Sequence, residues 1–80
     1  MIEQEIVASG KRRSARISNW YNERAFGFMN EEVDGVVLSY FFHLRDVTRG
    51  VPKTGEVCTF IPTAGEKGLR ATNIVVGGAL

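Results

Sequence analysis

The sequence predicts a small all-β domain of five short strands. Its 80 residues suffice for one domain, and nine glycines with two prolines favour frequent turns over long helices. Short alternating segments recur between turn signals at residues 15–21, 25–30, 36–44, 56–61 and 69–76. Strands of this length and spacing are typical of a small barrel or sandwich. Residues 1–14 precede the pattern as an N-terminal arm of undetermined order, and residues 15–78 form the domain.

The first strand, residues 15–21, has the sequence ARISNWY. Successive side chains of a strand point to opposite sides of the sheet. Ile17 therefore faces one side, and the opposite side carries Arg16, Ser18 and Trp20. The polar residues that follow begin a turn.

The second strand, residues 25–30, carries two rings that share one face, Phe26 and Phe28. Gly27 and Met29 share the opposite face. A glycine in a strand marks a site of close approach, because it has no side chain. We therefore expect the face with Gly27 to pack closely.

The third strand, residues 36–44, follows the stretch EEVDG, which predicts a turn with Asp34-Gly35 as its hairpin signal. This strand is too apolar to expose one whole face, so at least part of it is buried on both sides. Phe41 and His43 share one of its faces. The opposite face carries Tyr40, Phe42 and Leu44.

The last two strands follow a loop over residues 45–55. The fourth, residues 56–61, ends before Pro62, because proline cannot donate a ladder hydrogen bond. The turn AGEKG leads into the fifth strand. The predicted core takes one side chain or more from each strand, in the phase opposite to the paired rings: Ile17, Met29, Leu38, Phe42, Cys58, Phe60 and Ile74.

The two ring-bearing faces coincide if the second and third strands are hairpin neighbours. Cross-strand neighbours lie about 5 Å apart. Such spacing would assemble Phe26, Phe28, Phe41 and His43 into one outward patch, which Trp20 would extend. The opposite assignment would bury the histidine and expose the predicted core, which is a poorer partition.

The net charge of +1 does not indicate a partner, but the charge distribution is informative. Residues 11–80 carry ten Lys/Arg against seven Asp/Glu, and the run KRRSAR at residues 11–16 can contact phosphate. A solvated arm is the alternative interpretation of that run. Exposed rings beside bases suit single-stranded nucleic acid, since each stacked base contributes about 1–3 kcal/mol. Candidates for backbone or polar contacts are Arg16, Ser18, Arg24, Arg45, Lys67 and Arg70, with Lys11, Arg12 and Arg13 from the arm.

Several other kinds of site are not expected. One cysteine forms no internal disulfide, and one cysteine with one histidine forms no structural zinc site from this chain alone. No partner is placed by motif to make His43 a catalytic base, and Cys58 shares its phase with Phe60, as a buried inert thiol does. No secretory signal or membrane span is recognisable. We therefore expect a cytoplasmic protein without enzymatic activity, metal or cofactor.

Three motifs resemble the cold-shock domain of bacterial cold-shock proteins and eukaryotic Y-box proteins. The family pattern K-W-F-N-x-x-K-G-F-G-F-I corresponds to SNWYNERAFGFM, V-F-V-H-F to YFFHL, and G-x-K-G-P-x-A-x-N-V to GEKGLRATNI. The likeness covers residues 15–76. It implies a five-stranded antiparallel OB-fold barrel that binds single-stranded RNA or DNA by base stacking. It assigns stacking to Phe26, Phe28, Phe41 and His43.

The chain departs from this family pattern at several positions. Ala25 replaces a glycine, Leu44 a phenylalanine and Leu69 a proline. An ungapped match sets Trp20 against the family's phenylalanine, whereas a one-residue gap in the turn aligns NWYN with K-W-F-N. Tyr21 changes face between these two registers.

Two functions are compatible with these patterns. The first is binding of single-stranded RNA or DNA, with RNA-chaperone activity or regulation of transcription or translation as its consequence. Bases stacked on protein cannot pair with each other, so weak hairpins would open without ATP. The second is an OB-type protein-interaction module, in which the exposed rings contact another protein or a second copy of the chain.

Overall fold

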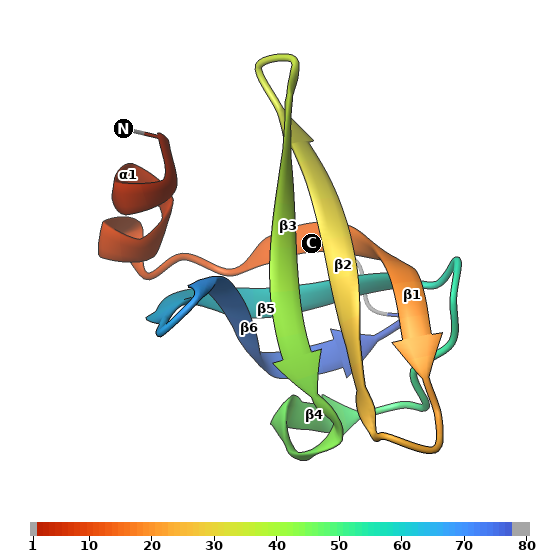
Figure 1. Cartoon of the computed structure of the whole chain (residues 1–80). Helices are drawn as coiled ribbons and strands as arrows, with labels where there is room; N and C mark the ends of the chain where they lie inside the picture. Colours follow the sequence, from red (N-terminus) through yellow and green to blue (C-terminus); the bar gives the residue numbers. More distant parts are fainter. Residues whose placement is uncertain (1, 78–80) are drawn as a thin grey trace.

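The computed structural model describes residues 2–77, which form a closed five-stranded barrel with one extra strand and one short helix (Figure 1). Met1 of the predicted arm and Gly78 of the predicted domain lie outside the described residues. The elements in chain order are α1 Ile2–Ser9, β1 Arg13–Tyr21, β2 Phe26–Val33, β3 Val36–His43, the 3₁₀ turn η1 Leu44–Asp46, β4 Val47–Arg49, β5 Val57–Gly65 and β6 Gly68–Val76.

The strand order is β3-β2-β1-β5-β6-β4, and β3 also pairs with β6. Four strand pairs are antiparallel: β1 with β2, β2 with β3, β1 with β5, and β5 with β6. The closing contact between β3 and β6 is parallel and sets Phe41 opposite Arg70. This topology is an OB-fold barrel, so the predicted fold class is confirmed and the sandwich alternative is excluded.

The barrel interior holds the core. All seven predicted core residues are at most 4% exposed, from Ile17 in β1 to Ile74 in β6. The largest additional core side chain is that of Tyr40, whose ring packs 4.6 Å, centroid to centroid, from that of Phe60. The alternation of the strands therefore predicted which phase faces inward.

The β2–β3 hairpin projects past the rest of the barrel (Figure 1). Its two-residue turn has positive φ at both positions, 51° at Asp34 and 80° at Gly35, as a type I′ turn requires. The predicted turn residues are correct, but the turn is shorter than EEVDG suggested. Because β2 continues to Val33, Glu31 is a strand residue paired with Leu38.

Two further predictions about strand extent were wrong. Strand β5 continues through Pro62, which pairs with Ala71 of β6. Pairing between β1 and β5 ends at Phe60, so Pro62 lies at an edge of the sheet, where strand prolines are tolerated. The predicted loop over residues 45–55 contains the short strand β4, which pairs with β6.

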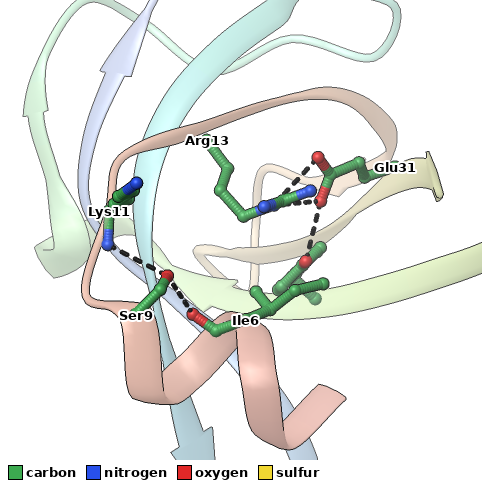
Figure 2. A network of polar contacts seen from close by, with 6 residues as sticks. Ile6, Ser9, Lys11, Arg13 and Glu31 are labelled. Carbon is green, nitrogen blue, oxygen red and sulfur yellow. Dashed lines mark hydrogen bonds and ion pairs between the residues drawn. The ribbon is translucent and has the colours of Figure 1, made fainter. Parts of the chain in front are cut away.

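The N-terminal segment packs against the barrel. Ile6 of α1 is 6% exposed and joins the core, and the Ser9 hydroxyl donates to the Ile6 carbonyl at 2.9 Å (Figure 2). Strand β1 begins at Arg13, two residues before the predicted start, because Arg13 and Ser14 pair with β5. No helix among residues 2–77 is long and apolar enough to span a membrane.

Candidate nucleic-acid interface

Strand register brings four rings together on the outer surface of β1, β2 and β3. Tyr21 pairs with Phe26 across β1 and β2, and Phe28 pairs with Phe41 across β2 and β3. His43 pairs with Phe26 on the other side of β2. Directly paired residues share a face of the sheet. We call Tyr21, Phe26, Phe28 and Phe41 the aromatic patch.

The rings of the aromatic patch touch one another in a continuous series. Tyr21 and Phe26 have centroids 5.1 Å apart and are tilted by 46°. Phe26 lies 6.1 Å from Phe28 and 5.8 Å from Phe41, and Phe28 lies 5.8 Å from Phe41. These spacings fall in the range of favourable edge-to-face and tilted pairs. The rings therefore support one another without being part of the barrel interior.

The patch is accessible to solvent. Tyr21 is 44% exposed, and the three phenylalanines and His43 are partly exposed. The intervening residues point inward, since Met29 and Phe42 are 0% exposed. The outward phase of β2 and β3 is therefore as predicted, while a role in stacking stays a prediction for each of these side chains.

Alternation in β1 was predicted wrongly beyond Ile17. The register passes from Ile17 opposite Met29 to Asn19 opposite Phe28, which leaves Ser18 as the extra residue of a β-bulge. The Ser18 hydroxyl donates to the Phe28 carbonyl at 3.3 Å. After the bulge, Asn19 and Tyr21 lie on the outward face of β1. Trp20 lies between them, is paired with Gly27 and takes the opposite face.

Trp20 therefore does not extend the outward face of the aromatic patch. Its ring stacks on Phe42, with centroids 5.5 Å apart and planes 12° apart, and it packs against the core. The indole N–H donates to Asn22 Oδ1 at 3.4 Å, and the side chain is partly exposed. Tyr21 occupies the outward position instead. Both motif registers considered from the sequence kept Trp20 as a stacking residue, because neither included the irregularity between Ile17 and Asn19.

Asp46 connects the end of β3 to β6. Its Oδ2 accepts hydrogen bonds from the His43 backbone N–H at 3.1 Å and from Arg70 Nη2 at 3.0 Å. The Arg45 backbone N–H donates to His43 Nδ1 at 3.2 Å, which orients the imidazole. The Arg70 guanidinium carbon lies 5.6 Å from the centre of the Phe41 ring. Sequence reasoning did not include Asp46, although its position three residues after His43 fits a capping box.

The other predicted basic contacts lie at the margins. Arg24 is exposed in the turn between β1 and β2, and Lys67 is exposed in the turn between β5 and β6. Arg16 donates from Nη1 to the Gly55 carbonyl at 2.8 Å, and its residue is exposed. Arg45 is exposed beside His43. Lys67 lies in the turn whose ends, Gly65 and Gly68, face α1. Among the predicted basic contacts, Arg70 is the one that contacts a ring of the patch.

The basic run at residues 11–16 divides between different faces. Lys11 is exposed before β1. Arg12 donates from Nη1 to Thr59 Oγ1 at 3.2 Å and to the Asn73 carbonyl at 2.8 Å. Arg13 pairs with Glu31 (Figure 2). The run is therefore not a free, uniformly solvated arm.

Arg13 and Glu31 form a partly buried network with Tyr40. Arg13 Nε donates to both Glu31 carboxylate oxygens, at 2.9 and 3.0 Å, and the Tyr40 hydroxyl donates to Glu31 Oε1 at 2.8 Å. Burial, followed by the Glu31 carboxylate, raises the pKa of Tyr40 above its ordinary value. The hydrogen bond to Glu31 raises the pKa of Arg13. This network makes Arg13 a structural residue of the barrel.

Two departures from the cold-shock pattern have clear structural settings. Ala25 has φ of 58°, a conformation that glycine adopts more easily, so alanine is strained at this position. The Ala25 carbonyl accepts from the Leu44 N–H at 2.8 Å. Leu44 is 45% exposed and places an aliphatic side chain just after His43. The residue after His43 is therefore not an aromatic platform.

No protein-family model matches the chain, and no curated protein matches it significantly. The fold and the surface geometry by themselves define an OB-fold barrel with the aromatic patch on its outer face. The cold-shock resemblance rests on the sequence motifs.

Proposed function

We propose that the chain binds single-stranded RNA or DNA by stacking bases on the aromatic patch. The observation that carries this proposal is a series of four partly exposed rings on one face of an OB-fold barrel, with neighbouring centroids 5.1 to 6.1 Å apart. Unpaired bases have two apolar faces and polar edges, which suits a surface of rings bordered by arginine. The resemblance to cold-shock domains supports the same proposal.

Stacking supplies most of the proposed affinity. Three or four stacked bases would contribute about 3–12 kcal/mol before the cost of ordering the strand. Backbone contacts contribute less, because the chain carries a net charge of only +1 and Arg13 and Arg70 are already ion-paired. Each remaining phosphate contact adds a single-strand salt slope of about −0.7. We therefore expect binding with a shallow salt dependence.

The consequence of such binding is competition with base pairing. A base held on Phe26, Phe28 or Phe41 cannot stack within a hairpin, so weak hairpins open as the strand is bound. The process needs no ATP and no catalytic group. RNA-chaperone activity, or control of transcription or translation through an opened hairpin, would follow from this competition.

The test is a fluorescence-anisotropy titration with labelled hexathymidylate and hexauridylate at two salt concentrations. Phe28→Ala should weaken binding of either strand by about 1–3 kcal/mol. Val37→Ala is the matched control, because Val37 is 61% exposed on the neighbouring strand and lies outside the patch. An effect of equal size in both variants, or no binding by the folded wild type at low salt, would refute the proposal.

A protein-interaction module is the second candidate, and exposed Leu44 next to His43 favours it. An aliphatic side chain packs against protein as readily as against a base. Analytical ultracentrifugation of the same sample decides whether the patch is occupied by a second copy. A dimer that Phe28→Ala dissociates, together with no binding of either oligonucleotide, would support this function instead.

A further inference from the structure

Arg70 differs from the exposed basic side chains Arg24 and Arg45 because it forms an ion pair and contacts a ring of the aromatic patch. Its Nη2 lies 3.0 Å from Asp46 Oδ2, and its guanidinium carbon lies 5.6 Å from the Phe41 centroid. The Arg70 and Asp46 side chains are 32% and 14% exposed. Arg70 is thus held beside the Phe41 ring, while Arg24 is exposed in a turn.

A phosphate group is a poor partner for this arginine. The Asp46 carboxylate balances the guanidinium charge at hydrogen-bond distance, and it would repel a second anion brought to the same place. A neutral acceptor meets no such repulsion. The edge of a nucleobase provides neutral acceptors. Because the guanidinium lies over the Phe41 ring, a base stacked on the neighbouring rings of Phe26 and Phe28 would bring its edge to Arg70.

Arginine discriminates among base edges because its guanidinium has five N–H donors and no acceptor. Guanine presents N7 and O6 as adjacent acceptors, which a guanidinium contacts with two parallel hydrogen bonds. Adenine presents an acceptor beside the N6 amino donor, so the same approach sets two donors against each other. The contact with Asp46 uses one terminal nitrogen of Arg70, Nη2. This contact fixes the orientation of the guanidinium, and its other N–H donors stay available to a base.

We infer that Arg70, positioned by Asp46, makes the Phe41 end of the aromatic patch selective for guanine in a single strand. This inference rests on the proposed function. Arg70 contacts the base in this scheme. Asp46 is a positioning residue, because it holds Arg70 and the His43 backbone N–H with the same oxygen.

The experiment compares four hexamers by anisotropy: d(TG)₃, d(TA)₃, d(TC)₃ and (dT)₆. The wild type should bind d(TG)₃ about tenfold more tightly than d(TA)₃, the discrimination typical of one bidentate contact. It should also prefer d(TG)₃ to (dT)₆, because thymine has an N–H donor between its two carbonyl acceptors. Unpaired cytosine presents N3 and O2 side by side, so d(TC)₃ binding as tightly as d(TG)₃ would overturn selectivity for guanine. Replacing guanine by 7-deazaguanine removes the N7 acceptor and should reduce the preference.

Arg70→Lys separates base recognition from phosphate attraction, because lysine keeps the charge and loses the planar fork. It should abolish the guanine preference and leave (dT)₆ affinity within about twofold, if phosphate contacts are unchanged. Asp46→Asn should lower the preference while (dT)₆ affinity stays the same or rises, since a negative charge is removed. Arg24→Gln is the control, and it should weaken all four hexamers equally.

The possible outcomes distinguish this inference from the proposed function. Equal weakening of all four hexamers by Arg70→Lys, or a wild type without guanine preference that still binds (dT)₆, would overturn the inference alone. Failure of the folded wild type to bind any hexamer would overturn both. Thermal unfolding checks that each variant is folded. If Asp46→Asn destabilises η1, Arg70→Lys still decides the question, because Arg70→Lys leaves the His43–Asp46 capping box of η1 in place.

Discussion

Phe41 and Phe42 are neighbours in β3 with opposite environments, and alanine at each should separate binding from stability. Phe42 is 0% exposed and stacks on Trp20 at 5.5 Å. Its truncation should cost about 3–5 kcal/mol, a large share of the roughly 4–12 kcal/mol available to a chain of 80 residues. At about 4–8 °C for each kcal/mol, Phe42→Ala should lower the melting temperature by at least about 12 °C.

Phe41 is partly exposed and contacts Phe26, Phe28 and Arg70 at the surface. Phe41→Ala should cost about 1–3 kcal/mol of stability, the scale of its two aromatic pairs and less than Phe42→Ala, and about 1–3 kcal/mol of oligonucleotide binding. Urea unfolding followed by circular dichroism and anisotropy with (dT)₆ measure the two quantities. Equal destabilisation by both substitutions, or unchanged binding in Phe41→Ala, would show that the assignment of faces to functions is mistaken.

Three further predictions concern the barrel itself. Gly27→Ala should destabilise the fold by about 1–3 kcal/mol or more in urea unfolding, because a Cβ there would collide with the Asn19 carbonyl oxygen. Burial, followed by Glu31, raises the pKa of Tyr40 in the folded chain. The resulting stabilisation is fully present below about pH 10, the ordinary pKa of tyrosine, and is lost as pH rises above that value. Stability measured from pH 8 to 11 should therefore fall above pH 10, and less so in Tyr40→Phe; an identical decline in both would contradict this. Burial raises the pKa of Cys58 to about 11, so a thiol reagent at pH 8 should label it only as urea unfolds the chain.

Local alternation predicted the inward and outward faces of β2 and β3 because it has a strict period of two. Gly27 between two rings indicated which side packs closely, and Met29 and Phe42 confirmed it by being fully buried. The hairpin turn was equally readable, since Asp34-Gly35 suits two successive positive φ angles. Such features depend only on neighbours in the sequence.

The errors involve features that depend on distant parts of the chain. Pro62 is compatible with a strand only because β1 has already left that edge of β5. Arg70 meets Asp46 through the closing contact of β3 with β6, which no local pattern encodes. The role of Glu31 likewise depends on an ion pair with Arg13, which lies 18 residues earlier in the chain.

The bulge at Ser18 has a consequence for comparing this chain with others. A chain lacking that residue would run from Ile17 directly to Asn19, still pairing them with Met29 and Phe28 as they pair now. Its exterior would keep Tyr21 where it is. A deletion at position 18 should therefore leave the outward face of β1 unchanged, and alignments of this segment should match side-chain orientation before they match residue count.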